Sequence, residues 1–261
     1  MQDKIDSFTH LHLHSSFGSL QDGVGKPVDY CEKAASIGQQ ALAVTEHGSC
    51  ASHFAFHQAG VATDIKPIYG CEFYFTNDHT LRGLTDEEKD GLTPTEVREA
   101  NKLRLRKSHL LLLAETNEGL ENIYRLNYHA NMFGFYGKPT IDIPLLRKYN
   151  KGIIATTTCV ISPMARMLQS KKIDDMSVWF EDMLEVFGKD RFFIELHPHA
   201  LDIQREYNQV LIEMFRKKYD VKTLLANDVH YVDQEHHEVH NFLWRLNTDG
   251  KFDEAGIDKL H

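Results

Sequence analysis

Short apolar segments alternate with amphipathic segments along the chain. Runs rich in β-branched and aromatic residues predict seven strands, over 8–14, 41–45, 66–75, 109–114, 152–157, 191–197 and 223–227. Helical spacing of apolar residues predicts helices over 27–37, 51–59, 118–131, 161–169, 174–187, 203–219 and 234–246. The first of these helices opens on Pro27, because proline suits the first helical turn.

This alternation of strands and helices decides the expected fold class. Strands separated by helices are typical of crossover connections and therefore of a parallel sheet. No strand pattern breaks the alternation, so we expect an α/β fold whose seven strands close into a barrel. One long interruption, 76–108, is charged and predicts a helical excursion outside the barrel. We therefore expect a single domain over residues 1–261 that carries this excursion.

Composition places the chain among ordinary globular proteins. Its 261 residues are 42% hydrophobic and 26% charged, which excludes the disordered and fibrous classes. Apolar runs fall short of the ~18 residues that a membrane span needs, and residues 1–6 lack the layout of a signal peptide. We expect a cytoplasmic protein with no membrane partner. The four cysteines (Cys31, Cys50, Cys71 and Cys159) lack CxxC spacing, which predicts reduced thiols.

The charge balance limits the partners. A net charge of −9 argues against a protein that coats nucleic acid non-specifically, since that mode of binding needs many lysine and arginine contacts to phosphate. A nuclease stays open, because divalent cations reverse the local field inside a carboxylate-lined pocket. The basic stretch 102–107 could guide a polyanion towards such a pocket, although a solvated helix face is the alternative interpretation.

Two strand ends carry pairs of metal-binding side chains. In the first predicted strand, His12 and His14 lie two residues apart and therefore project to one face. Asp228 and His230 repeat this spacing after the apolar run 224–226. A single His-x-His is common by chance, but two such pairs can bind one metal cluster from opposite walls.

Further ligand types follow the other predicted strands. The candidates are His12, His14, Asp22, His47, Glu72, His109, Cys159, Asp228 and His230. Most of them lie at or just beyond the carboxyl ends of strands, where barrel enzymes place their chemistry. His109 is the exception, because it lies at the start of its predicted strand. Cys159 alone would more often be a small buried hydrophobe. Taken together, the pattern predicts a multinuclear metal site and hence hydrolysis.

Several motifs resemble one known family, the polymerase and histidinol phosphatase (PHP) domain. They are HLHLHS (10–15), SLQDG (19–23), AVTEHG (43–48), KPIYGCE (66–72), SHLLLLA (108–114), GFYGKP (134–139) and NDVHY (227–231). Within that family, the chain is most similar to the form found at the N-terminus of bacterial replicative DNA polymerase III alpha subunits. Two positions depart from the family pattern: Glu46 stands where aspartate is usual, and Thr140 replaces a common basic residue.

This resemblance implies a distorted, seven-stranded, TIM-barrel-like fold with a trinuclear centre. Two or three divalent ions would bind there, with zinc, manganese, magnesium or iron as occupants. All nine family ligand positions carry a ligating residue here, so the site resembles a chemically competent copy. We expect Glu72, Asp228 and His230 to lie closest to the chemistry, and His10 and Glu46 to orient the imidazoles. Candidate substrate contacts are Lys138, His197 and Arg106.

The resemblance favours phosphodiester hydrolysis, in the form of a proofreading-type 3′–5′ exonuclease. Its substrate would be the single-stranded or frayed 3′ end of DNA, and its partners a polymerase module or other replisome components. A phosphomonoesterase of the histidinol phosphatase type and an inactive structural domain are the alternatives. The chain stops at His261, before the regions where the family's polymerase begins. We therefore expect either a domain of a larger polymerase or a freestanding relative, without DNA synthesis of its own.

Overall fold

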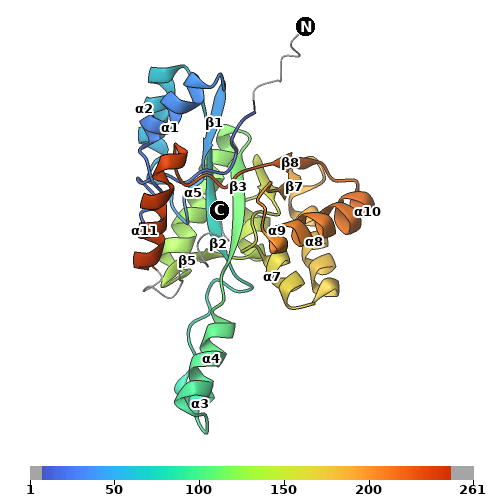
Figure 1. Ribbon diagram of the computed structural model, residues 1–261. Helices are drawn as coiled ribbons and strands as arrows, with labels where there is room; N and C mark the ends of the chain where they lie inside the picture. The colour runs from blue at the N-terminus through green and yellow to red at the C-terminus, as the bar shows by residue number, and fades with distance from the viewer. Residues whose placement is uncertain (1–7, 248–261) are drawn as a thin grey trace.

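A curled mixed sheet organises the molecule (Figure 1). The structure is a computed structural model that describes residues 8–247, so the expectation about residues 1–6 lies outside the described part. The strands are β1 (Ala41–Val44), β2 (Lys66–Phe75), β3 (Ser108–Ala114), β4 (Phe135–Tyr136), β5 (Lys138–Ile141), β6 (Ile153–Thr156), β7 (Phe192–Leu196) and β8 (Thr223–Leu225). Their order is β4-β5-β2-β3-β6-β7-β8, and β1 pairs with β2.

The direction of β3 corrects the expected parallel sheet. β3 runs antiparallel to both of its neighbours, β2 and β6, whereas β1–β2, β2–β5, β6–β7 and β7–β8 are parallel pairs. The segment between β2 and β3 holds the helices α3 (Asp86–Lys89) and α4 (Pro94–Arg104), which project away from the body (Figure 1). Because these helices do not cover the sheet as a crossover helix would, the chain re-enters the sheet at the end where it left.

The segment 10–14 joins the two edges of the curled sheet. We expected a strand over 8–14, but the only ladder contact there is a single parallel bridge between Leu13 and Val229. On one side, Thr45 N donates to Leu13 O at 2.9 Å; on the other, His14 N donates to Val229 O at 2.8 Å. The α/β class is therefore confirmed, with a sheet that forms a half-barrel and a short linking segment across its opening.

Helices cover this sheet. They are α1 (Pro27–Ser36), α2 (His53–Thr63), α5 (Asn117–Met132), α6 (Ile143–Lys148), α7 (Pro163–Gln169), α8 (Ile173–Phe187), α9 (Asp202–Val210), a π-helical turn η1 (Leu211–Arg216), α10 (Lys217–Tyr219), a 3₁₀ turn η2 (Gln234–His236) and α11 (His237–Asn247). The predicted helices are all present. The pattern missed α6, β4 and β5, because each of these elements is too short to show a period.

Polar caps explain where several helices begin. Thr116 accepts a hydrogen bond from Gly119 N at 3.1 Å at the start of α5, and Ser162 accepts one from Ala165 N at 3.2 Å at the start of α7. Asp142 caps α6 in the same way. Each cap satisfies a backbone N–H that the helix leaves unpaired, so the chain turns from strand or loop into helix at these residues.

Two hydrophobic clusters hold the elements in place. The larger lies between the sheet and α5, α7, α8 and η1, and the smaller packs α1 and α2 against β1 and the 10–14 segment. Leu13 belongs to the smaller cluster and is 1% exposed. Burial of Leu13 therefore points the neighbouring side chains of His12 and His14 to the opposite face. Among residues 8–247, no helix is long and apolar enough to cross a bilayer.

Thr45 ties this linking segment to β1, which leads to a first prediction. Its hydroxyl accepts from Leu13 N at 2.8 Å and lies 3.1 Å from Leu13 O. Thr45→Val keeps the shape but leaves the Leu13 N–H buried without a partner, so we expect a loss of about 2 kcal/mol in the free energy of unfolding. Urea unfolding followed by circular dichroism measures this loss. Thr223→Val, at an exposed position of β8, is the control; an equal loss in both variants would contradict the role of Thr45.

Candidate metal centre

The Glu72 carboxylate lies at the centre of a cluster of imidazoles. Glu72 is 1% exposed and lies on β2. Its oxygens lie 2.5 Å from His47 Nδ1, 2.9 Å from His109 Nδ1 and 3.2 Å from His12 Nε2. Burial alone would raise the pKa of Glu72, but the charges of His109 and His47 hold it well below its usual range. Glu72 is therefore a carboxylate whose charge is balanced by imidazoles.

The position of His109 follows from the direction of β3. His109 lies at the start of β3, as the sequence predicted, and pairs with Tyr74 near the end of β2. Because the two strands are antiparallel, the start of β3 lies at the same edge as the end of β2. The strand boundary was thus correct and only the assumed direction was wrong. This reversal brings the His109 imidazole to the edge where the other candidates lie.

Asp228 faces the two histidines of the linking segment. Asp228 Oδ1 lies 3.3 Å from His12 Nε2 and 3.2 Å from His14 Nε2. Within residues 8–247, these three buried atoms have no hydrogen-bond partner. Asp228 has a φ of +52°, a left-handed conformation that a residue with a side chain adopts at a cost. That bend follows β8 directly and turns the chain so that Val229 pairs with the 10–14 segment.

Asp22, His47 and His230 form the third side of the cluster. Asp22 Oδ2 lies 3.2 Å from His47 Nε2 and 3.9 Å from His230 Nε2. The His14 ring stacks against those of both His47 and His230, with centroid distances of 3.9 and 4.5 Å. Burial and the neighbouring charges of His47 and His230 lower the pKa of His14 to about 3. His14 is therefore a neutral imidazole, the form that binds metal ions.

Cys159 approaches the cluster from the loop after β6. Its Sγ lies 3.8 Å from Glu72 Oε1 and 3.8 Å from His109 Nδ1. Burial and the negative charge of Glu72 raise the pKa of this thiol well above its usual range. A nearby cation would reverse that effect, because a coordinating thiol gives up its proton.

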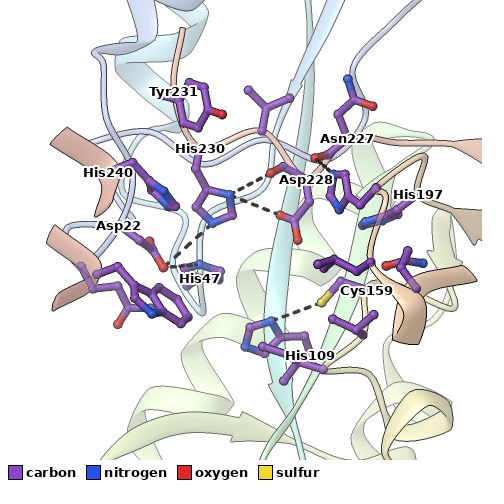
Figure 2. Close-up of a pocket in the computed structure, with 18 of the residues that line it drawn as sticks. Asp22, His47, His109, Cys159, His197, Asn227, Asp228, His230, Tyr231 and His240 are labelled. Atoms are coloured by element: carbon purple, nitrogen blue, oxygen red, sulfur yellow. Dashed lines mark hydrogen bonds and ion pairs between the residues drawn. The ribbon is translucent and has the colours of Figure 1, made fainter. Parts of the chain in front are cut away.

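These side chains border one cavity of about 660 Å³. Figure 2 shows six of the nine candidates on its wall: Asp22, His47, His109, Cys159, Asp228 and His230. The other three, His12, His14 and Glu72, are buried and contact residues of that wall directly. The structure thus brings all nine residues together around this cavity.

The donor set fits a group of bound cations. Ligand atoms of three sets lie within 4.8 Å of one another: His14, His47 and His230; His12, His14 and Asp228; His47, Glu72 and His109. Imidazole and carboxylate donors in these proportions suit zinc, manganese or iron. The unpartnered atoms of His12, His14 and Asp228 converge where an ion would satisfy them.

The two residues expected to orient the imidazoles lie in different places. His10 lines the cavity. Glu46 is fully buried and accepts hydrogen bonds from the hydroxyls of Ser15 at 2.5 Å and Ser19 at 2.7 Å. Ser19 Oγ in turn lies 3.1 Å from His14 Nδ1. Glu46 therefore reaches an imidazole through Ser19, while it holds the turn that carries Asp22.

Two of the three candidate substrate contacts line the cavity, and the third does not. Lys138 and His197 line the cavity, whereas Arg106 is exposed and lies outside its lining. Lys138 Nζ donates to Gln21 Oε1 at 2.6 Å and lies 5.1 Å from the centroid of the Tyr74 ring. The ammonium group of Lys138 is thus held at the cavity wall by a neutral partner.

Sequence reasoning missed Glu195, a fully buried carboxylate on β7. Glu195 Oε1 lies 2.8 Å from both His12 Nδ1 and His197 Nε2, and the Thr156 hydroxyl donates to the other oxygen. The sequence signal was a carboxylate inside an otherwise apolar strand, two residues before His197. Because Glu195 accepts a hydrogen bond from His12 Nδ1, the proton of the neutral imidazole stays on Nδ1. The other nitrogen, His12 Nε2, then faces Glu72 and Asp228.

The contact between Glu195 and His12 generates a second prediction. Glu195→Gln keeps the shape of the side chain but weakens the acceptor for His12 Nδ1. We therefore expect metal affinity to fall by about 10- to 100-fold, while the protein stays folded. Isothermal titration with zinc or manganese measures this loss. Glu185→Gln, which breaks only an exposed ion pair with Arg147, is the matched control. Equal affinities in the two variants would contradict the orienting role.

The raised pKa of His47 leads to a third prediction. Burial opposes its charge, but Glu72 and Asp22 raise the pKa of His47 to about 10. In the metal-free protein, this ion pair stabilises the fold fully below pH 6.5, and that stabilisation is lost as the pH rises through about 10. A metal ion that binds His47 must displace its extra proton. We therefore expect metal affinity to rise as the pH increases from 6.5 to about 10, and about one proton to be released from His47 on binding. Calorimetry in buffers of different ionisation enthalpy counts the protons, and an affinity that falls with pH would contradict this.

Comparisons with known proteins show which sequences and which fold are similar to this chain. Residues 10–199 match the family model of the PHP domain. The DNA polymerase III alpha subunit of Aquifex aeolicus is 34% identical over 92% of this chain and 20% of its own length; that of Thermus aquaticus is 33% identical over 95% and 19%. The chain thus spans about a fifth of the length of these relatives.

One solved structure resembles the fold. It is a Bifidobacterium adolescentis protein described as a metal-dependent phosphoesterase, with a TM-score of 0.50 and 12% identity over 85% of this chain and 87% of that one. At this identity the likeness concerns the fold alone.

Proposed function

The chain belongs to the PHP domain family, and we propose that it hydrolyses phosphodiesters of DNA as a 3′–5′ exonuclease. Its fold is that of PHP-family metal-dependent phosphoesterases and is related to the PHP domain of polymerase III alpha subunits. The observation that carries the proposal is the convergence of all nine ligating side chains on one cavity. A purely structural domain has no need to keep so many ionisable groups buried together.

We propose that the nine residues hold two or three divalent ions. His12, His14, Asp22, His47, Glu72, His109, Cys159, Asp228 and His230 are the ligands. Zinc, manganese, magnesium or iron would supply activation of water and neutralisation of phosphate charge when bound. Asp228 and Glu72 each lie within reach of several imidazoles, which suits carboxylates that serve more than one ion.

The protein's own side chains prepare the cavity for this reaction. His14 is neutral and offers a lone pair without first losing a proton. His230 lies 3.7 Å from Asp228 Oδ1 at the cavity wall, beside the space that a substrate would enter. Lys138 supplies a positive charge on the same wall for a phosphate oxygen.

The proposed setting is DNA replication. The similar relatives are polymerase subunits, so we propose that a polymerase module or other replisome components are the partners, in the cytoplasm. The DNA end would be single-stranded or frayed, because an end released from its base pair can enter a cavity further than a stacked duplex end can. In this proposal residues 1–261 act as one domain with the 76–108 excursion.

A primer assay tests the proposed function. The parent, supplied with manganese, zinc or magnesium, should shorten a 3′-mismatched labelled primer from its 3′ end. His12→Ala and Asp228→Ala should each reduce the rate at least ~100-fold, because each removes a ligand from the cluster. His57→Ala, which removes an exposed histidine bonded to Tyr69, should not change it.

The other outcomes separate the alternatives. Equal degradation by the parent and both ligand variants would mean that the cleavage comes from a contaminant. Hydrolysis of histidinol phosphate or p-nitrophenyl phosphate without any shortening of the primer would select a phosphomonoesterase. No hydrolysis of any ester, with every metal tested, would select a structural domain.

A further inference from the structure

Positive side chains surround the start of β3, beside the candidate metal centre. Arg106 and Lys107 immediately precede β3, Lys138 opens β5, and Arg166 lies on α7. We call these four residues the cationic rim. Lys138 lines the cavity, and the rim extends from it across the entrance to β3.

Backbone contacts fix the rim close to His109. Ile161 O accepts from His109 N at 3.2 Å and from Arg166 Nε at 3.2 Å, and Ile161 itself lines the cavity. On the other side, Lys107 Nζ donates to Tyr136 O at 2.6 Å, within the turn that leads to Lys138. The rim is therefore attached to the same backbone that positions a candidate metal ligand.

None of the four rim cations forms an ion pair with a carboxylate of the described residues. Within residues 8–247, no member of the rim has a carboxylate oxygen within 4.0 Å. By contrast, Arg104 lies 2.6 Å from Glu88, and Arg147 lies 2.5 Å from Glu185. The positive charges of the rim are therefore not neutralised by an adjacent carboxylate and are available to an anion.

The rim cations also repel one another. Burial and the charge of Lys138 lower the pKa of Lys107, and burial and the charge of Arg106 lower the pKa of Arg166. Lys107 and Lys138 are thus one like-charged pair within the rim, and Arg106 and Arg166 are the other. An anion bound between them would relieve this repulsion.

Exposed aromatic rings adjoin the rim. Phe135 and Tyr136 form β4, directly before the turn to Lys138, and are 52% and 44% exposed. Cations that follow a phosphate backbone, next to aromatic rings on which bases stack, are the two features of surfaces that bind single-stranded nucleic acid.

We propose that the cationic rim binds the backbone of a single-stranded nucleic acid whose end enters the cavity. This inference rests on the proposed function and deepens it. It assigns Lys107 and Arg166 to substrate binding, together with Arg106 and Lys138, and it places Phe135 and Tyr136 beside the bases. Four cations from separate parts of the chain and two exposed rings are more than a single phosphate group needs, so the preferred substrate is an oligonucleotide and not a mononucleotide ester.

Binding measured without turnover tests the rim. The probe is a fluorescein-labelled phosphorothioate oligothymidylate of about 12 nucleotides, followed by anisotropy at several salt concentrations. The double variant Arg106→Gln/Lys107→Gln should bind about tenfold more weakly, and its slope of log affinity against log salt should fall by roughly 1.4. Arg166→Gln should reduce the slope by about half that amount, and Arg166→Lys should restore it.

The matched control is Arg216→Gln/Lys217→Gln. Both residues are exposed, lie where η1 meets α10 and do not line the cavity, and the charge change is identical. The control should keep the parent's affinity and slope within about twofold, because a local contact and not the overall charge is removed. If the Lys107 substitution unfolds the protein, Arg106→Gln alone, which removes no hydrogen bond of the described residues, should show about half the change in slope.

Two results would contradict the proposed binding role of the cationic rim. One is an equal loss of affinity in the rim and control doubles, which would indicate general attraction only. The other is competition: if a polyglutamate of similar charge displaces the labelled probe as well as unlabelled oligonucleotide does, the rim would fit an acidic protein partner. Shortening of the 3′-mismatched primer by the parent, measured separately, decides the proposed function, so failure of one does not imply failure of the other.

Discussion

The balance of charge around the buried Glu72 carboxylate is the constraint on which the site depends. A carboxylate removed from water is costly unless opposite charge or hydrogen bonds replace the lost hydration. Here His47, His109 and His12 provide that replacement, at 2.5 to 3.2 Å. Because three imidazoles must reach one carboxylate, the segments that carry them cannot move independently. The local geometry of the cluster is therefore also a constraint on the relative placement of β1, β2, β3 and the 10–14 segment.

The fold meets this constraint with two irregular features. The antiparallel entry of β3 brings His109 to the end of β2. The 10–14 segment is held by only a few backbone hydrogen bonds on either side and is not a regular strand. A fully regular parallel ladder would have placed the first residue of β3 at the opposite edge of the sheet. The departures from the regular barrel thus occur where ligands must be brought together, as is common at functional sites.

Much of the fold could be predicted from the sequence, and the remainder has physical reasons. The bounds of β2 match the prediction, since a long apolar run between polar segments is a strong local pattern. Strand direction could not be predicted, because the pattern within β3 is the same whichever way it runs. Glu195 was missed because its partner His12 lies 183 residues away, and only their contact at 2.8 Å reveals its role. Residue types indicated the candidate ligands, whereas their distances needed the structure.

The distribution of charge links the two proposals. Four buried or nearly buried carboxylates, Asp22, Glu72, Glu195 and Asp228, face the imidazole cluster and pair with its positive charge, so without cations the cavity offers no excess positive charge to a phosphate. Bound divalent ions would supply that charge only within the cavity, since screening limits its reach to about 8 Å at physiological salt. A longer anionic substrate therefore needs a second source of positive charge outside the cavity. The cationic rim provides it without depending on the ions, so binding of the chain and reaction of its end are physically separable steps.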